Sequence, residues 1–175
     1  MENNIFILSG GQGEGKTTRL GELLPLLEES GIRTAGFVAK GSWEGGMRSG
    51  FTLADIQGSV EKTLCTTQVT DGWIALGRFY FDPEVILWGE QMLQQGILNR
   101  ADLFVMDEMG KFELSGNVWH PIFDSLLRNN KSLLVTVRSD FITQFIEKYT
   151  LENVQIFTTD DDLEQIVNRI RTALK

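Results

Sequence analysis

The sequence predicts an α/β fold: a mostly parallel sheet flanked by helices, with a small inserted β-hairpin, in a single domain of residues 1–175. Two observations predict it. Strand-like and helix-like hydrophobic patterns alternate along most of the chain, which is typical of parallel strands connected by helices. The composition, 42% hydrophobic and 23% charged, is ordinary for a globular protein, and 175 residues are enough to build one core.

Hydrophobic spacing gives the elements in chain order. The strands are short apolar runs, expected at residues 5–9, 34–39, 51–56, 60–64, 75–81, 103–106, 133–137 and 154–157. The helices have apolar residues three and four apart, and are expected at residues 17–29, 82–98, 118–127, 141–148 and from 161 onward. The two strands around Gly58 form the inserted hairpin. Residues 65–73 are polar and fit neither pattern.

Proline and glycine mark where several elements begin and end. Pro25 predicts a kink or an early stop in the first helix, and Gly31 fits its C-terminal cap. Residues 41–46 are expected to form a glycine-rich turn. Pro83 opens the second helix at an early position, where proline is well tolerated. One apolar stripe supports the last helix: Leu163, Ile166, Val167, Ile170 and Leu174.

Charge and cysteine content exclude some classes of protein. The net charge of −8 argues against general nucleic-acid binding, but a phosphate site needs only local amides and one or two cations. No apolar run approaches the roughly 18 residues that a membrane span needs, so no membrane association is expected. Cys65 is the single cysteine and is expected to be a small buried residue. A reducing compartment suits it, so we expect a cytoplasmic location.

The strongest motif is the run Gly-Gly-Gln-Gly-Glu-Gly-Lys-Thr at residues 10–17, which matches the Walker A pattern between an expected strand and helix. Backbone amides and the helix N-terminus there converge on one anion site, and glycines let phosphate oxygens approach. Lys16 supplies a charge for the β and γ phosphates, the Thr17 hydroxyl is the expected Mg²⁺ ligand, and Thr18 lies near the α phosphate. The predicted nucleotide-binding residues are Gly10, Gly11, Gln12, Gly13, Glu14, Gly15, Lys16, Thr17 and Thr18. The motif therefore predicts a P-loop that binds a nucleoside triphosphate.

A second motif is the run Leu-Phe-Val-Met-Asp-Glu at residues 103–108, which has the Walker B arrangement. A strand this apolar is buried on both faces, so its two carboxylates are expected at the carboxyl edge of the sheet, beside the P-loop. Asp107 is expected to hold Mg²⁺ through a water. Glu108 is expected to orient and deprotonate the water that attacks the γ phosphate.

Developing charge on the γ phosphate is usually met by an additional cation. The candidates are Arg48, Arg78, Lys111 and Arg138, and position in the chain favours Lys111 and Arg138. Each of them is about equally well explained as a solvated surface charge.

Two other residue types stand out. His120 is the single histidine; it is expected to pack or to cap a helix, because no nucleophile or ligand cluster accompanies it. Trp43, in the glycine-rich turn, is a candidate for stacking on a base, although most tryptophans are core residues.

Several stretches together resemble the THEP nucleoside-triphosphatase family. They are residues 10–18, the Gly-Phe pair at 36–37, the Arg-Ser-Gly-Phe run at 48–51, residues 76–82, and the run Asp-Glu-Met-Gly-Lys-Phe-Glu-Leu at 107–114. The last run is similar to the family signature Asp-Glu-Ile-Gly-Lys-Met-Glu-Leu. The resemblance spans most of residues 5–138.

The resemblance implies a RecA-like P-loop domain that hydrolyses nucleoside triphosphates with Mg²⁺ and with loose base selectivity. It also places Glu108, Gly110 and Lys111 at the family's functional positions. Two stretches differ from the family pattern. Ala39, Gly41 and Trp43 replace a Thr-x-Glu-x-Arg run, and Thr159, Asp160 and Asp161 replace an Asn-Arg pair before the last helix.

Three hypotheses about function follow. The leading one is a Mg²⁺-dependent hydrolase that converts ATP, GTP and other nucleoside triphosphates to diphosphate and phosphate, with Lys16, Glu108 and Lys111 as catalytic residues. The second is a small-molecule kinase in which the hairpin and the turn around Trp43 close over an acceptor. The third is a nucleotide-gated binding module with slow hydrolysis, in which the γ phosphate orders residues 108–117. No protein partner is indicated.

Overall fold

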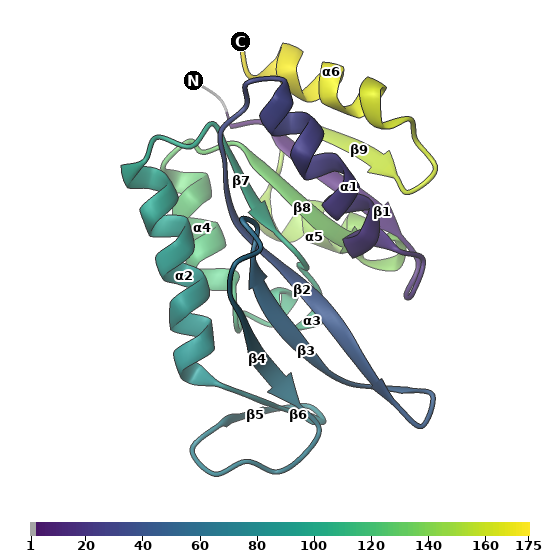
Figure 1. Ribbon diagram of the computed structural model, residues 1–175, viewed down its shortest axis with the longest axis vertical. Coiled ribbons are helices and arrows are strands. Elements are labelled where there is room, and N and C mark those ends of the chain that lie inside the picture. The colour runs from purple at the N-terminus through teal and green to yellow at the C-terminus, as the bar shows by residue number, and fades with distance from the viewer. Residues whose placement is uncertain (1–2) are drawn as a thin grey trace.

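The computed structural model describes residues 3–175, and the nine strands in this range form one sheet with helices on both faces (Figure 1). The strands are β1 (Ile5–Gly10), β2 (Thr34–Glu44), β3 (Met47–Asp55), β4 (Glu61–Thr66), β5 (Ile74–Leu76), β6 (Phe79–Phe81), β7 (Leu103–Met106), β8 (Leu133–Arg138) and β9 (Val154–Thr158). The helices are α1 (Lys16–Glu29), α2 (Pro83–Leu98), α3 (Lys111–Leu114), α4 (His120–Arg128), the 3₁₀ turn η1 (Ser139–Phe141), α5 (Ile142–Tyr149) and α6 (Leu163–Ala173).

The strand order is β5-β6-β4-β3-β2-β7-β8-β1-β9. From β2 to β9 every neighbouring pair is parallel, and β8 lies between β1 and β7. From β2 to β5 every pair is antiparallel. The predicted α/β architecture is confirmed, and so is the hairpin around Gly58, which connects β3 to β4. The antiparallel part is larger than that hairpin, because β5 and β6 add to it and β2 continues into it.

The side chains of the central strands feed two hydrophobic layers. In β1, Ile5 and Ile7 point to the layer that holds α2, α4 and α5, while Phe6 and Leu8 point to the layer that holds α1 and α6. Strand residues alternate between faces, so both faces of the sheet are apolar and need a helix layer. The stripe predicted for the last helix is confirmed, since Ile166, Val167 and Ile170 of α6 are buried in the second layer.

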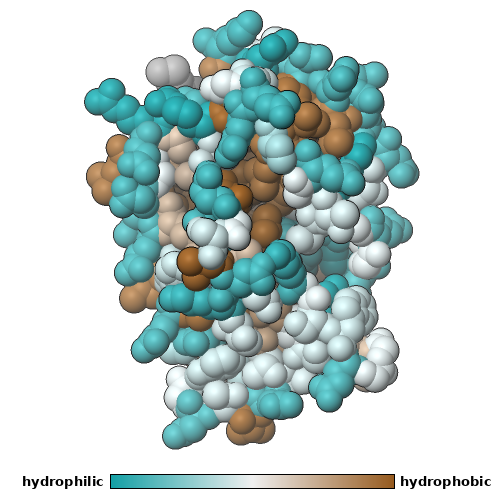
Figure 2. All heavy atoms as spheres, in the orientation of Figure 1, coloured by the Kyte–Doolittle hydropathy of each residue, from teal (hydrophilic) through white to brown (hydrophobic). Residues whose placement is uncertain are grey.

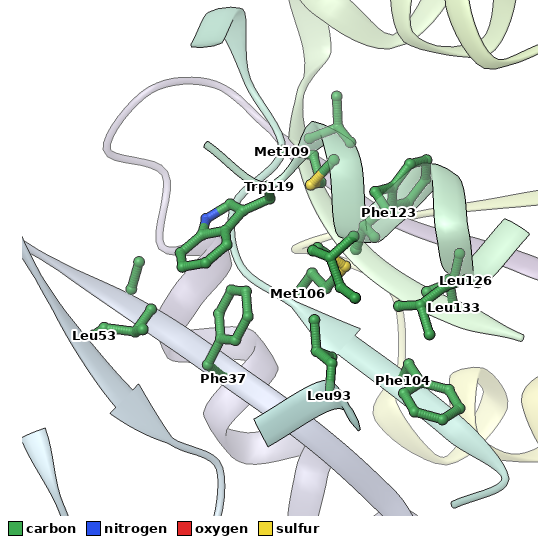
Figure 3. Packing of buried hydrophobic residues seen from close by; sticks show 14 of the residues in the cluster. Phe37, Leu53, Leu93, Phe104, Met106, Met109, Trp119, Phe123, Leu126 and Leu133 are labelled. Carbon is green, nitrogen blue, oxygen red and sulfur yellow. The ribbon is translucent and has the colours of Figure 1, made fainter. Parts of the chain in front are cut away.

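An aromatic contact organises the first layer. The indole of Trp119 lies against the ring of Phe37 with centroids 4.4 Å apart, close to Leu53 and Met109 (Figure 3). A Cβ added to Gly89 of α2 would lie 2.6 Å from the Trp119 ring, so α2 approaches closely because it has a glycine there. This packing ties the segment after β7 to the helix layer and to β2.

Hydrophilic side chains cover most of the face that carries α1 and α6, and apolar side chains show between them in patches (Figure 2). Within residues 3–175, no helix combines the length and the apolar character that crossing a membrane requires. The cytoplasmic location expected from the sequence stays a prediction. Cys65 is buried as expected, and burial raises the pKa of its thiol to about 12.

Pro25 does not stop the first helix, because α1 continues to Glu29. Proline at this position frees the carbonyl of Gly21, one turn earlier. Both residues are exposed, so water can hydrate that carbonyl, while the leucine face of the helix stays packed. The helix ends at Glu29 as predicted, and Gly31 follows it with a φ of 85° and donates its amide to the carbonyl of Glu28.

Three other expectations about the middle of the chain were wrong. The expected turn at residues 41–46 is mostly strand, because β2 and β3 pair as far as Glu44 and Met47 and only Gly45 and Gly46 turn. The strand expected at residues 75–81 is two antiparallel strands, β5 and β6, which reverse at Gly77. The helix expected from residue 118 begins at His120 because Val118 has a φ of 49°, outside the helical region, and the short α3 was not predicted.

Gly36 is the position where β2 comes closest to β7. Its φ is 138°, and a Cβ there would lie 1.9 Å from the carbonyl oxygen of Val105. We expect Gly36→Ala to lower the free energy of unfolding by about 3 kcal/mol, as measured by urea denaturation. The matched control is Gly21→Ala in α1, where a Cβ meets nothing within 4 Å; it should raise stability by about 0.5–1 kcal/mol. An unchanged midpoint for Gly36→Ala would contradict this account of the sheet.

Candidate active site

The glycine-rich loop connects β1 to α1 at the carboxyl edge of the sheet. Gly13 and Gly15 have φ values of 75° and 80°, a left-handed conformation that suits glycine. Lys16 is 6% exposed, and its Nζ donates to the carbonyl of Gly11 at 2.9 Å. Its Nζ also lies 3.4 Å from the carbonyl of Gly10, so the lysine folds back over its own loop. The carboxylate of Glu14 accepts from the amide of Gly11.

Asp107 directly follows β7 and is completely buried. Its Oδ2 accepts from the hydroxyl of Thr17 at 2.8 Å and from the amide of Ala39 at 3.1 Å, and its Oδ1 accepts from the hydroxyl of Thr136. Burial raises the pKa of Asp107, and these three hydrogen bonds oppose the rise. The two motifs recognised in the sequence therefore meet, as expected from the shared edge of parallel strands.

Glu108 is half-buried in the wall of the same cavity. Burial and the charge of Asp107 raise the pKa of its carboxyl, while the charges of Lys16, Arg48 and Arg138 lower it. Three cations from three separate segments therefore act on Glu108. The geometry surrounds the space in front of Glu108 with positive charge, as a site for an anion requires.

The cavity has a volume of about 540 Å³, within the range of small-molecule sites. All four cations considered from the sequence line it: Arg48, Arg78, Lys111 and Arg138. Arg138 pairs with Asp140 at 2.6 Å, and its Nη1 lies 3.4 Å from the side-chain oxygen of Gln12. Trp43 lies at the rim and is 54% exposed.

Two sets of residues that line the cavity were not predicted from the sequence. One is an aromatic and aliphatic wall made by Phe51, Leu64, Phe79, Phe81 and Phe112. The other is Glu113, which is 4% exposed and accepts from the amide of Gly110 at 2.8 Å, capping α3. Their signals were weak, because the aromatic residues are scattered along the chain and α3 has only four residues.

The residues present fit a magnesium ion. Mg²⁺ prefers oxygen ligands, and it usually takes one or two from the protein while keeping waters and substrate phosphates. The Thr17 hydroxyl and the Asp107 carboxylate, already in contact, are such a set. Among residues 3–175 no cluster of three or more His, Cys, Asp or Glu residues could hold a metal independently of a substrate.

His120 has the packing role expected for it. Its Nδ1 lies 2.9 Å from the Tyr149 hydroxyl, and the two rings are tilted against each other with centroids 5.6 Å apart. The Tyr149 hydroxyl also lies 3.3 Å from the carbonyl of Glu113 and donates to it. This chain of contacts links α4 and α5 to the end of α3.

A glycine-rich loop between a central parallel strand and a helix, facing a buried carboxylate at the same sheet edge, defines a P-loop nucleotide-binding protein. Comparison with known proteins narrows this class. A family model described as NTPase matches residues 5–171. The chain belongs to this family, whose relatives below are nucleoside-triphosphatases of the THEP1 type, and it is therefore a nucleoside-triphosphatase.

Two relatives illustrate the similarity in sequence. Nucleoside-triphosphatase THEP1 of Methanocaldococcus jannaschii is 30% identical over 172 residues, which cover 98% of this chain and 99% of that protein. The protein of the same name from Caldivirga maquilingensis is 28% identical over 180 residues, covering 99% of this chain and 98% of the other. The resemblance described from the motifs is confirmed.

Two solved structures share the fold. The crystal structure of THEP1 from the hyperthermophile Aquifex aeolicus has a TM-score of 0.68 at 19% identity and covers 98% of this chain and 99% of its own. The solution structure of a human cancer-related nucleoside triphosphatase has a TM-score of 0.60 at 22% identity, with 99% and 97% covered. At these identities the likeness shows the fold alone.

Glu113 predicts a dependence of stability on pH. Burial raises the pKa of its carboxyl to about 8, so the folded chain holds a proton that the unfolded chain releases near pH 4.5. The contribution of Glu113 to the free energy of unfolding therefore falls as pH rises from about 4.5 to about 8. Glu113→Gln stays neutral and keeps an acceptor for Gly110. We expect its stability relative to wild type to improve by a few kcal/mol across this window.

The measurement is urea denaturation of both proteins at a series of pH values. Glu147→Gln is the matched control, because Glu147 is exposed on α5 and its carboxylate is solvated in both states. The difference between this control and wild type should not change with pH. Parallel stability curves for wild type and Glu113→Gln would contradict the buried neutral carboxyl.

Proposed function

We propose that the chain is a Mg²⁺-dependent enzyme that hydrolyses ATP, GTP and other nucleoside triphosphates to nucleoside diphosphate and phosphate. One observation carries the proposal. The Thr17 hydroxyl lies 2.8 Å from the Asp107 carboxylate, so the loop that would hold the phosphates and the strand that would hold the metal already meet. Glu108, the next residue, faces the same cavity.

The P-loop would bind the triphosphate through the amides and side chains of Gly10, Gly11, Gln12, Gly13, Glu14, Gly15, Lys16, Thr17 and Thr18. Lys16 would turn from the carbonyls of its loop to the β and γ phosphates. The carboxylate of Glu14, bound to the Gly11 amide, would have to leave that amide to a phosphate oxygen. Lysine and amides then stabilise the charge that leaves with the diphosphate.

Thr17 and Asp107 would hold the magnesium ion, Asp107 through a water. When bound, the ion neutralises phosphate charge and fixes the orientation of the chain of phosphates. The Thr136 hydroxyl and the Ala39 amide keep the Asp107 carboxylate in place by hydrogen bonds. Ligand residues that are themselves hydrogen-bonded hold their geometry before the substrate arrives.

Glu108 would orient a water molecule and take its proton as the water attacks the γ phosphorus. Its place at the cavity wall, one residue past Asp107, supports this role. Arg48 is the best-supported cation for the charge that develops on the γ phosphate, because its charge acts on both Asp107 and Glu108. Arg138 is already paired with Asp140. A catalytic role for Lys111, which lines the same cavity, stays a prediction.

The nucleoside would leave the P-loop on the side of Thr18 and meet the turn between β9 and α6. The Thr159 methyl group lies 3.4 Å from the position of a Cβ on Gly10, and Arg19 donates to the backbone carbonyl of Asp161 at 2.5 Å. Within this turn, the Thr158 amide donates a hydrogen bond to the Asp161 carboxylate. A base edge placed there meets backbone and acidic groups rather than a base-specific pocket, which supports loose base selectivity.

Phosphate release tests the proposal, measured for ATP, GTP, CTP and UTP with and without Mg²⁺ and with no second substrate. We expect turnover of all four, dependent on Mg²⁺. Glu108→Gln should lose about 100-fold or more in turnover, because the general base is missing, while it keeps nucleotide affinity. Undiminished turnover in this variant would remove Glu108 from the mechanism.

Lys16→Ala is the companion variant, and it should lose both binding and turnover. Activity equal to that of wild type would point to a contaminating enzyme. Phosphate transfer that requires an added metabolite would favour the kinase hypothesis over the hydrolase.

A further inference from the structure

The cavity continues past the residues that the triphosphate needs. One end is formed by the P-loop and Glu108. The other end is lined by residues of the antiparallel extension and of α3, and we name it the aromatic end: Phe51, Leu64, Arg78, Phe79, Phe81 and Phe112. Nothing in the hydrolysis of a triphosphate by water uses this second end.

The P-loop fixes the direction in which the triphosphate lies, and this step rests on the proposed function. Thr18 serves the α phosphate, and Lys16 and Thr17 serve the β and γ phosphates, so the chain of phosphates runs from Thr18 towards Glu108. The aromatic end lies on the strands β3, β4 and β6, beyond β2 and β7 in the sheet. It is therefore on the far side of the γ phosphate.

The nucleoside lies at the opposite end of the phosphate chain. The turn from β9 to α6 borders the P-loop there: the Thr159 methyl lies 3.4 Å from the position of a Cβ on Gly10, and Arg19 donates to the carbonyl of Asp161. In the sheet, β9 and β6 are separated by six other strands. The base of a bound triphosphate consequently leaves the aromatic end free.

The aromatic end is lined by rings that pack against one another. The rings of Phe51 and Phe79 have centroids 6.2 Å apart, and those of Phe79 and Phe112 are 6.3 Å apart. Phe79 is itself buried, in the same core cluster as Leu64 of β4 and Phe81 of β6. At these distances the rings contact each other, and the partly exposed rings of Phe51 and Phe112 present apolar surface to the cavity.

A cationic side chain lies over each of these three rings. The guanidinium of Arg48 lies 5.0 Å from the Phe51 ring centre, that of Arg78 lies 4.9 Å from the Phe79 ring, and the ammonium of Lys111 lies 5.4 Å from the Phe112 ring.

Within residues 3–175, the side chains of Arg48, Arg78 and Lys111 form no ion pair and no hydrogen bond, so their N–H donors remain available. Arg48 faces the charges of Glu108 and Asp107, whereas no carboxylate pairs with Arg78 or Lys111 in the part of the chain that the structure describes. Asp107 is committed to three hydrogen bonds, and burial keeps the Glu113 carboxyl protonated at neutral pH. In a chain of net charge −8, the two cations without an acidic partner, Arg78 and Lys111, indicate an anionic ligand. Guanidinium and ammonium donors together suit a phosphate group.

We propose that the aromatic end is a second ligand site, which takes a planar aromatic ring carrying a phosphate group and holds it beyond the γ phosphate of the bound triphosphate. The ring lies against Phe51, Phe79 and Phe112. The phosphate is bound by Arg78 and Lys111. Nucleoside monophosphates and simple aryl phosphates share this chemistry.

Isothermal titration calorimetry in two stages tests the proposal. The protein is first titrated with the non-hydrolysable analogue AMP-PNP and Mg²⁺, which reports on the triphosphate site. The saturated complex is then titrated with AMP, UMP and phenyl phosphate, and with adenosine and ribose 5-phosphate as probes that lack the phosphate or the ring. We expect one further equivalent of a ring phosphate to bind, with adenosine and ribose 5-phosphate weaker by about tenfold or more. Binding of AMP and UMP alone, or of phenyl phosphate as well, shows whether the sugar is part of the ligand.

Two variants separate the second site from the first. Arg78→Glu reverses an exposed charge and should weaken ring phosphates by about tenfold or more. Phe112→Leu keeps apolar volume without a ring face and should weaken them severalfold. Arg171→Glu, on the exposed side of α6 at the other edge of the sheet, is the matched charge control and should bind as wild type. Stage one on each variant reports whether its triphosphate site is intact.

The outcomes are distinguishable. Normal binding of AMP-PNP with no heat from any ring phosphate would overturn the second site alone, and so would AMP that only displaces AMP-PNP or an Arg78→Glu variant that binds as wild type. Absence of AMP-PNP binding would overturn the proposed function, and this inference with it.

Discussion

The structure depends on the buried carboxylate of Asp107. An ionised carboxyl group in an apolar interior is costly unless donors surround it. Here the donors come from three separate elements: the Thr17 hydroxyl of α1, the Ala39 amide of β2 and the Thr136 hydroxyl of β8. The same hydrogen bonds that offset burial also fix the start of α1 against β2, β7 and β8. One buried group therefore holds the P-loop and the strand β7 together.

Sheet topology distributes the chemistry around that carboxylate. Because β8 lies between β1 and β7, the P-loop and Glu108 are separated by one strand, and the cavity forms in front of the gap. The charged residues of the cavity follow the carboxyl ends of the parallel strands, where open α/β sheets bind ligands. The antiparallel extension supplies the aromatic wall. The P-loop and the aromatic wall thus line one cavity, and hydrolysis by water does not require the aromatic wall.

The charged residues of the cavity could be predicted from the sequence, but its aromatic residues could not, for physical reasons. Residues 10–17 and 103–108 are local motifs, and parallel strands bring their ends together whatever connects them. The wall depends on contacts between Phe51, Phe79 and Phe112, which no local pattern encodes. The continuation of β2 as far as Glu44 depends on pairing with β3, which overrides the turn preference of its glycine. The short α3 depends on a cap from the buried Glu113 carboxyl rather than on helical periodicity.

We infer that hydrolysis requires the negative charge of Asp107 beside the P-loop. The most direct test of this requirement is phosphate release from Mg²⁺-ATP by Asp107→Asn, which keeps a side-chain oxygen to accept from Thr17 but carries no charge. The account predicts that a folded Asp107→Asn protein loses turnover by about 100-fold or more. Turnover close to that of wild type, in protein shown by denaturation to be folded, would contradict it.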